Sequence, residues 1–366
     1  MNKLDFLPRI ESLRGIAAVA VVGYHVGHLF DNLPAIGAVD AFAFRVFMGI
    51  SNGIGAVVAF FVLSGFVLAR SLDANPDPVR YFRNRFFRLF PAAIAVVGLL
   101  AALYDLFGIY VGFEASFDPL NVVLNMLMIR SDINGPMWSM TVECFATPLI
   151  LLTLLLFKRY GALPIVTLIV VLFGPSFWGP YVHVLGGATN LAPLYAFVVG
   201  VLVHCSGERI AAAINPGWAG LIALLVILAF CMFGIKKQTA PILMLECLST
   251  ATFIVLVVWH PAARMFNPLD FKLARFYGKI SYSFYLLHML GILFAGRLLG
   301  PMVLYVSGLS VFAVSVLTTF FAILLVTPLA YLSWRFIELP FIAVGRRLGA
   351  SSAALATKKN RVINYR

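Results

Sequence analysis

LRGIAAVAVVGYHVGHLF, residues 13–30, is the stretch of sequence that decides the fold. It is apolar apart from Arg14 and a pair of histidines, and it places His25 eleven positions after Arg14. In a helix that rises about 1.5 Å per residue, His25 lies roughly 16 Å deeper than Arg14. Ionisable groups at membrane depth are costly, and they mark a substrate path, a proton relay or a structural pair. The stretch therefore predicts a membrane helix whose polar residues face the interior of a bundle.

Composition extends this prediction to the whole chain. Of the 366 residues 62% are hydrophobic and only 11% are charged, which is too apolar for a soluble core. Long apolar runs without hairpin-like alternation favour helices over a barrel. The four cysteines have neither metal-site nor disulfide spacing, so we interpret them as packing residues and expect no metal. The net charge of +12 is interpreted as a sign of topology, and no nucleic-acid partner is expected.

About ten spanning helices are predicted, each with roughly twenty mainly apolar residues. The candidate spans are 11–30, 52–71, 90–108, 138–157, 161–178, 190–205, 217–234, 240–259, 275–297 and 303–338. If the amino terminus is cytoplasmic, the inner segments hold 22 of the 27 Lys and Arg residues, and only Arg45, Arg130, Lys236, Lys237 and Arg297 lie outside. This asymmetry predicts an all-α, multi-pass protein of the inner (plasma) membrane with both termini in the cytoplasm. The expected domains are a membrane domain, 1–345, and a basic tail, 346–366, which lies against anionic lipid.

His25 permits two interpretations. An imidazole inside the bilayer can act as a general base that takes a hydroxyl proton while an acyl group is attacked. It can equally be a structural histidine bonded to a neighbouring helix. The residues around it do not decide between the two.

The segment RYFRNRFFRLFP, residues 80–91, interleaves four arginines with aromatic residues at the predicted cytoplasmic face. Arginines bind phosphate bidentately and aromatic rings stack on bases, so Arg83, Arg85 and Arg88 suit a nucleotide-bearing acyl donor such as coenzyme A. The alternative is a basic anchor that lies on lipid head groups.

Polar residues also enter two later apolar helices. Glu143 must pair with a cation or bind a proton there, so it either orients His25, contacts Arg14 or forms a structural ion pair. Trp138, five residues earlier, is either an interfacial belt residue or the wall of a sugar site.

The predicted ninth helix carries a polar stripe. Ser281, Tyr285 and His288 are spaced i, i+4, i+7, which places them on one face. His288 follows Lys279 by nine residues, a depth similar to that of His25 below Arg14. Two histidines from different helices are therefore expected to meet at one cavity.

Together these motifs resemble those of the acyltransferase family 3 integral-membrane proteins. The resemblance rests on the order of Leu13-Arg14-Gly15…His25, the Phe60–Phe66 run, Arg85-x-x-Arg88 before Pro91, Trp138-Ser139…Glu143, Ser281-Tyr282…Tyr285…His288, and Glu338-Leu339-Pro340. It implies a ten-helix domain that moves an acyl group, usually acetyl from cytoplasmic acetyl-CoA, onto a hydroxyl of an extracytoplasmic carbohydrate or glycolipid. It further implies that Arg14 and His25 form the family's arginine-to-histidine motif and that Arg85 and Arg88 form its cytoplasmic arginine pair.

Two positions depart from the family pattern. Cys144 stands where many members have an aromatic residue, and Met289-Leu290 replaces the proline often found beyond the ninth-helix histidine. Some members also carry an extracytoplasmic hydrolase-like domain. Because this sequence ends soon after the tenth predicted helix, we expect either direct acylation in the membrane domain or completion by a separate extracytoplasmic transferase.

The resulting hypothesis is an O-acetyltransferase in which His25 is the general base. Glu143 orients or charge-balances it, and Trp138, Ser139, Ser281, Tyr285 and His288 line the acceptor side. A rival hypothesis is a proton-coupled transporter or flippase of a lipid-linked sugar that uses the same buried residues as a relay. Repeated halves or matching broken helices, which are typical of such transporters, are not evident in the sequence.

Overall fold

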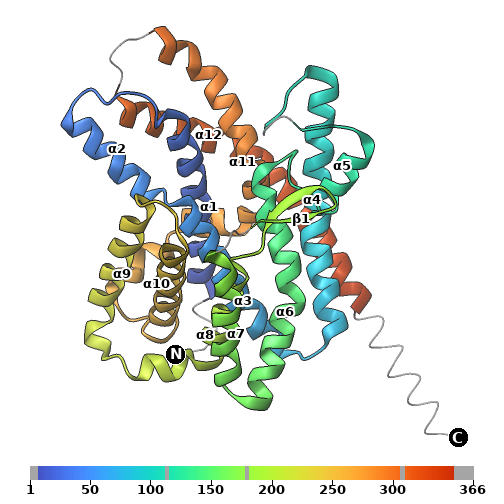
Figure 1. Cartoon of the computed structure of the whole chain (residues 1–366), viewed down its shortest axis with the longest axis vertical. Coiled ribbons are helices and arrows are strands. Elements are labelled where there is room, and N and C mark those ends of the chain that lie inside the picture. The colour runs from blue at the N-terminus through green and yellow to red at the C-terminus, as the bar shows by residue number, and fades with distance from the viewer. Residues whose placement is uncertain (1–6, 112–114, 178–180, 306–309, 350–366) are drawn as a thin grey trace, which may run out of the picture.

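The computed structural model describes residues 7–111, 115–177, 181–305 and 310–349, and there the chain is almost entirely helical (Figure 1). The helices are α1 (Leu7–Phe30), α2 (Ala38–Ile50), α3 (Gly53–Ala74), α4 (Pro78–Phe107), α5 (Pro119–Met126), α6 (Trp138–Tyr160), α7 (Leu163–Phe173), α8 (Leu194–Ala212), α9 (Ala219–Gly234), α10 (Ala240–Trp259), α11 (Lys272–Tyr305) and α12 (Val311–Ser333). The strands β1 (Tyr181–Val184) and β2 (Gly187–Asn190) pair as one antiparallel hairpin. The predicted all-α transmembrane bundle is therefore confirmed.

Nine helical segments within the described residues are long and apolar enough to cross a membrane. Nine of the ten predicted spans overlap them, and the exception is 161–178. Two of the nine begin too early, because α8 starts only at Leu194 and the span 303–338 begins within α11. There α7 has only 11 residues, which reach about 16 Å, roughly half of the hydrocarbon core. This helix is thus too short to be the complete crossing that was predicted. The cytoplasmic location of both termini stays a prediction, and most of the basic tail, 350–366, lies outside the described residues.

Side-chain caps explain where several helices begin. The side chain of Asn52 accepts a hydrogen bond from the backbone N–H of Gly55 and so starts α3 immediately after α2. Asp77 caps α4 in the same way, with Pro78 at the first helical position, and Ser310 caps α12. The helix α2 was not predicted, because 31–51 was left between two spans. It lengthens α3 into one apolar segment, Ala38–Ala74, that bends at the Asn52 cap.

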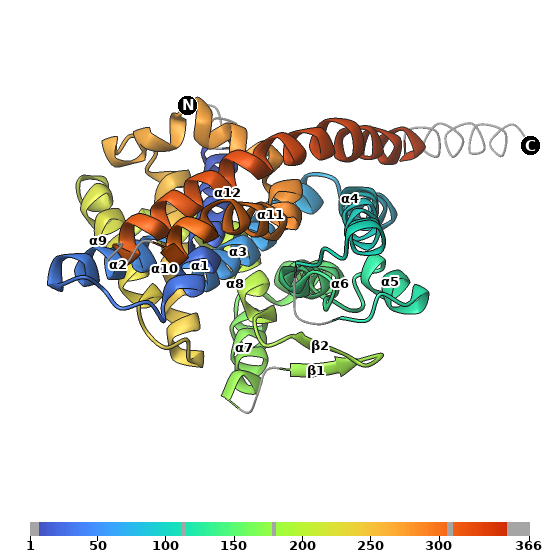
Figure 2. The same ribbon diagram turned by 90° about the horizontal axis from the view of Figure 1, so that it is seen from above.

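The first helix lies inside the bundle, as Figure 2 shows from above. It packs mainly against α11 and α3, with further contacts to α12 and α2. Gly15 of α1 faces Gly278 of α11, and a Cβ at either glycine would meet the backbone of the opposite helix. Such small residues let two membrane helices approach until their backbones touch. The close pair α1–α11 therefore brings the polar residues of both helices to one place.

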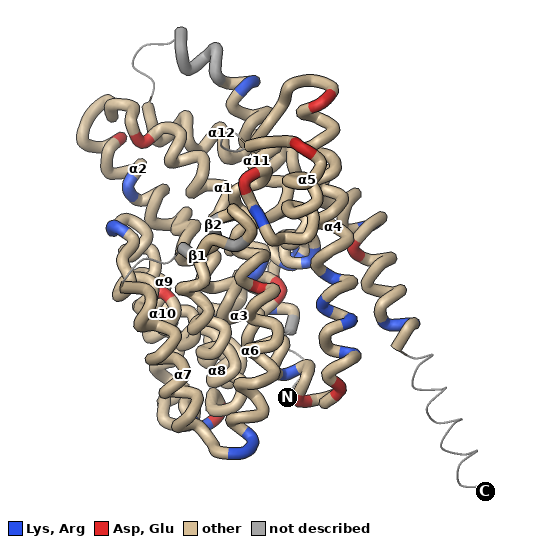
Figure 3. Tube along the Cα trace, turned by 45° about the vertical axis from the view of Figure 1, so that its right-hand side comes forward, with Lys and Arg blue, Asp and Glu red and all other residues tan. Residues whose placement is uncertain are grey.

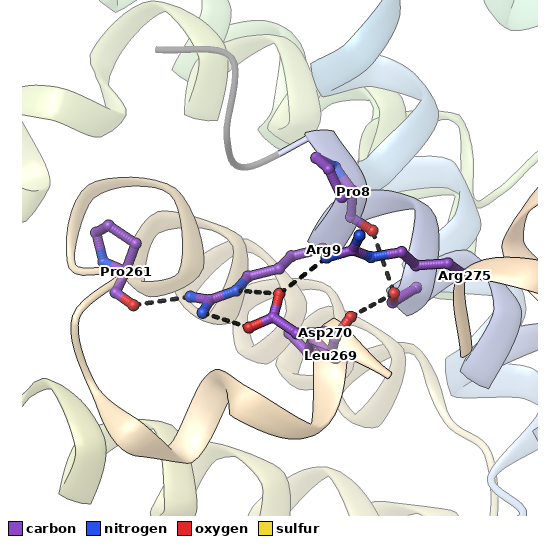
Figure 4. A network of polar contacts seen from close by, with 7 residues as sticks. Pro8, Arg9, Pro261, Leu269, Asp270 and Arg275 are labelled. Atoms are coloured by element: carbon purple, nitrogen blue, oxygen red, sulfur yellow. Dashed lines mark hydrogen bonds and ion pairs between the residues drawn. The ribbon is translucent and has the colours of Figure 1, made fainter. Parts of the chain in front are cut away.

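A polar network anchors the start of α1 (Figure 4). Arg9 binds both carboxylate oxygens of Asp270, at 3.0 and 2.7 Å, and donates to the carbonyl of Pro261 at 2.7 Å. Arg275 reaches the same carboxylate at 3.3 Å. The hydrogen bond from Arg9 is the main reason that the pKa of Asp270 lies below its usual value. Because Asp270 ends the 3₁₀ segment Arg264–Asp270, the network ties α1 to the turn that precedes α11.

Candidate active site

A small, largely apolar cavity with a few polar groups lies among α1, α3, α6 and α11. It measures about 30 Å³, enough for one or two water molecules, and Arg14, Ser64, Glu143 and Ser281 contribute its polar groups. The hydroxyl of Ser281 is buried and has no hydrogen-bond partner among the described residues. A buried donor without a partner is uncommon, so this hydroxyl is available to a bound molecule.

The carboxylate of Glu143 is held by an arginine rather than by a histidine. Arg85 Nη2 lies 2.5 Å from Glu143 Oε1, and the Ser64 hydroxyl donates to the same oxygen at 3.3 Å. The two charged side chains are exposed by only 10% and 12%. A pair this enclosed holds together strongly, because losing either partner leaves a charge in a poorly solvated site. Of the alternatives for Glu143, the structure therefore shows the ion pair, and no hydrogen bond joins it to His25 among the described residues.

A second, larger cavity of about 420 Å³ adjoins the first. His25 and Trp138 line it, together with Tyr24, Val57 and Tyr285. Val57 and Tyr285 also line the small cavity, so the two spaces meet at these side chains. Arg14 and His25 lie on the same helix, but each lines a different one of the two adjoining cavities.

The junction of the two cavities is fixed by hydroxyl groups. Ser139 Oγ lies 2.9 Å from Tyr285 Oη, and both hydroxyls lie 3.0 Å from the carbonyl oxygen of Pro136. Ser139 and Tyr285 are buried and come from α6 and α11. The bonds fix the Tyr285 ring in the wall that both cavities share.

The rings of the two predicted histidines lie close together, but His288 lines neither of these two cavities. The ring centroids of His25 and His288 are 5.2 Å apart. The Nδ1 of His288 lies 2.5 Å from the backbone carbonyl of Tyr285, which can only accept, so this nitrogen carries the proton. In the neutral ring Nε2 is then an acceptor, and it is buried without a partner among the described residues. His288 therefore places a second neutral imidazole, with a free acceptor nitrogen, next to His25.

The basic segment of α4 is only partly available to a ligand. Figure 3 shows Lys and Arg gathered along the first turns of this helix. Arg85 is paired with Glu143, and Arg83 donates through Nε to the carbonyl of Gly345 at 2.9 Å. Arg88 is half-buried and makes no hydrogen bond within the described residues. Of the three predicted phosphate ligands, Arg88 is the one whose guanidinium makes no hydrogen bond or ion pair among the described residues.

The structure brings most of the predicted residues together and adds others. Arg14, Glu143, Ser139, Ser281 and Tyr285 line the small cavity, whereas Trp138 and His25 line the large one. Ser64 and Tyr24 were not predicted as site residues. Ser64 lies in the Phe60–Phe66 run, and Tyr24 directly precedes His25, so both were adjacent to recognised motifs. Within the described part of the chain, no cluster of three His, Cys, Asp or Glu residues could hold a metal ion.

The chain is similar in sequence to several proteins of Staphylococcus aureus. Proteins of strains COL, MSSA476 and MRSA252, whose names give them provisionally as O-acetyltransferases, are each 25% identical to the chain over 384 aligned positions. These alignments cover 93% of this chain but only 58% of each relative. The chain therefore spans little more than half the length of the relatives that it matches. No solved structure gave a significant match.

The sequence profile of the family described as "Acyltransferase domain" matches residues 7–335, nearly the whole of the described chain. This range includes every residue that lines the two cavities. The chain belongs to acyltransferase family 3.

Proposed function

We propose that this protein is an integral-membrane O-acyltransferase of the inner (plasma) membrane. It moves an acyl group, most simply acetyl, from cytoplasmic acyl-CoA to a hydroxyl of a carbohydrate or glycolipid on the opposite side. The observation that carries the proposal is the pair of adjoining cavities, one lined by Arg14 and the other by His25. The names of the S. aureus relatives support acetyl as the group transferred.

On the acceptor side, His25 is the general base. Its ring lines the larger cavity, which has room for a sugar ring, and Trp138 gives that cavity an aromatic wall. As the acceptor oxygen forms its bond to the acyl carbon, the C–S bond breaks and the hydroxyl proton moves to His25. The departing thiolate then takes up that proton, which restores the neutral imidazole. His288, 5.2 Å behind His25, shares or relays the charge.

The small cavity suits the acyl carbonyl. Negative charge develops on the carbonyl oxygen during attack, and groups already aimed at that oxygen lower the barrier. Ser281 offers a hydroxyl without a partner, and Arg14 supplies a fixed positive charge in the same cavity. Both groups line the small cavity, whereas His25 lines the adjoining one, so an acyl carbonyl at the junction could be reached by the donors and by the attacking hydroxyl.

On the donor side, the residues fit the phosphates of coenzyme A only in part. Arg88 makes no hydrogen bond or ion pair among the described residues, and Phe86 and Phe90 beside it are stacked with their centroids 4.7 Å apart. Arg85, in contrast, is already paired with Glu143. A cavity of about 30 Å³ is also too small for the pantetheine arm, so donor entry requires the side chains around it to part. Replacing Arg88 by alanine is expected to raise the KM for acyl-CoA, whereas an unchanged KM would favour lipid anchoring.

Inside-out vesicles supplied with radiolabelled acetyl-CoA test the proposal. Wild-type protein should move label to carbohydrate, and His25→Ala protein, inserted at the same level, should not. His204→Ala is the matched control, because His204 is also half-buried in a membrane helix but pairs with Asp73, away from both cavities. Full activity of His25→Ala would refute the assignment of the base. Movement of carbohydrate without transfer of label would instead support the transporter hypothesis.

A further inference from the structure

A third cavity, of about 390 Å³, is lined by cationic side chains. Arg45 of α2 and Lys236 and Lys237 of the turn after α9 line it, together with Tyr24 and His28 of α1. Figure 3 shows Lys and Arg on α2 beside those at the end of α9. Two segments far apart in the sequence therefore contribute three cations to one space, and a third segment, α1, contributes Tyr24 and His28.

These cations stand out against the charge distribution of the chain. The predicted topology leaves only five Lys and Arg residues on the outer side, and three of the five line this cavity. The remaining two have other surroundings, because Arg130 is bonded to Asn121 and Leu185 and Arg297 lies on α11. The segments that are otherwise poorest in cations thus concentrate them at one place.

The positive charge has little compensation. Within the described residues, the side chains of Arg45, Lys236 and Lys237 form no hydrogen bond or ion pair. The single carboxylate that lines the cavity, Asp31, lies 3.1 Å from His28 Nδ1. Three cations face one carboxylate, so the cavity attracts an anion.

The cationic cavity adjoins the acceptor side of the site. Tyr24 lines both it and the cavity of His25. The Tyr24 ring packs edge-on against His25 at 5.4 Å and against His28 at 4.4 Å. His25 and His28 are three residues apart on α1, roughly 4.5 Å along the axis. The Tyr24 side chain therefore forms the wall that the cationic cavity shares with the cavity of His25.

We propose that this cationic cavity binds an anionic group of the acceptor, a phosphate or a carboxylate, while a hydroxyl of the same molecule lies at His25. This inference rests on the proposed function and narrows its substrate class to acidic carbohydrates or phosphate-bearing glycolipids. The anion would hold the acceptor in one orientation and so select which hydroxyl is acylated.

Three small glycosides that differ only at C6 test the inference. Methyl β-glucoside is neutral, methyl β-glucuronide carries a carboxylate and the 6-phosphate of methyl β-glucoside carries a phosphate. Binding to the purified full chain is measured by calorimetry in the His25→Ala background, where no turnover occurs. At least one anionic probe should bind about tenfold more tightly than the neutral one, as a few partly exposed ion pairs allow, and salt should reduce the difference. The anion with the larger preference identifies the source as an acidic sugar or a phosphate.

Charge-neutralising variants locate the effect. Two variants remove the cavity cations: Lys236→Gln/Lys237→Gln and Arg45→Gln. Each should lower the affinity for the anionic probe and leave the affinity for the neutral probe unchanged. Arg297→Gln removes an outer cation elsewhere and should change neither of these two affinities. Equal binding of all three probes by the parent protein, or an anion preference that survives in both cavity variants, would overturn the inference. Transfer of label by wild-type protein is scored separately, so failure of the proposed activity and failure of the anion site give different results.

Discussion

The ion pair between Arg85 and Glu143 permits a quantitative prediction. Its nitrogen and oxygen are 2.5 Å apart, and its side chains are exposed by 10% and 12%. Removing one partner of such an enclosed pair costs about 3–5 kcal/mol, because the other charge stays buried without compensation. Arg85→Met and Glu143→Met should therefore each lower the free energy of unfolding by about that amount.

The double variant distinguishes this explanation from a simple loss of contacts. Arg85→Met/Glu143→Met removes both charges and fills the space with apolar side chains, so its stability should lie within about 1 kcal/mol of the wild type. The free energy of unfolding is measured by titration with SDS in mixed micelles, and the four proteins form a double-mutant cycle. An Arg85→Met protein as stable as the wild type, or a double variant that loses the sum of the two single losses, would refute the reasoning.

Three further predictions follow from the geometry. If the unpartnered hydroxyl of Ser281 stabilises the carbonyl oxygen as proposed, Ser281→Ala should lower kcat about a hundredfold in the vesicle assay with little change in thermal stability. An unchanged kcat would remove that role. Gly15→Ala should cost about 1–3 kcal/mol in SDS titration, since its new Cβ meets the α11 backbone, whereas Gly296→Ala, with open space around it, should cost nothing. The hydrogen bond from Arg9 lowers the pKa of Asp270, so its stabilisation is complete above the ordinary value of 3.8 and is lost as pH falls through the lower folded pKa. Melting temperatures between pH 3 and 7 should accordingly converge for wild type and Asp270→Asn only at the acid end.

The spans and the meeting of the polar helices could be predicted from the sequence. Apolar length identifies a membrane helix directly, and the cost of burying Arg14, His25 and Ser281 requires them to face the bundle interior. Residues on one face of α11 were therefore expected to share a site with α1, and they do.

Partner choice could not be predicted in the same way. By charge alone Glu143 could orient His25, contact Arg14 or form a structural ion pair, and Arg85 could bind either a nucleotide phosphate or lipid head groups. Only the placement of α4 against α6 decides that the two residues, 58 positions apart, bond to each other. The prediction of a complete crossing at 161–178 failed for a different reason, because an apolar run does not show where a helix ends. The α-helix α7 ends at Phe173, and only a short 3₁₀ helix, Gly174–Phe177, follows it.

The glycine contact between α1 and α11 also determines which part of the bundle can move. Two helices whose backbones touch at Gly15 and Gly278 cannot separate without opening a void along their whole interface. They should behave as one rigid body that carries Arg14, His25 and Ser281 in fixed relation. If the path for a donor widens, we expect α4 and α6 to move rather than α1 and α11. The ion pair between Arg85 and Glu143 would then have to break for α4 and α6 to separate.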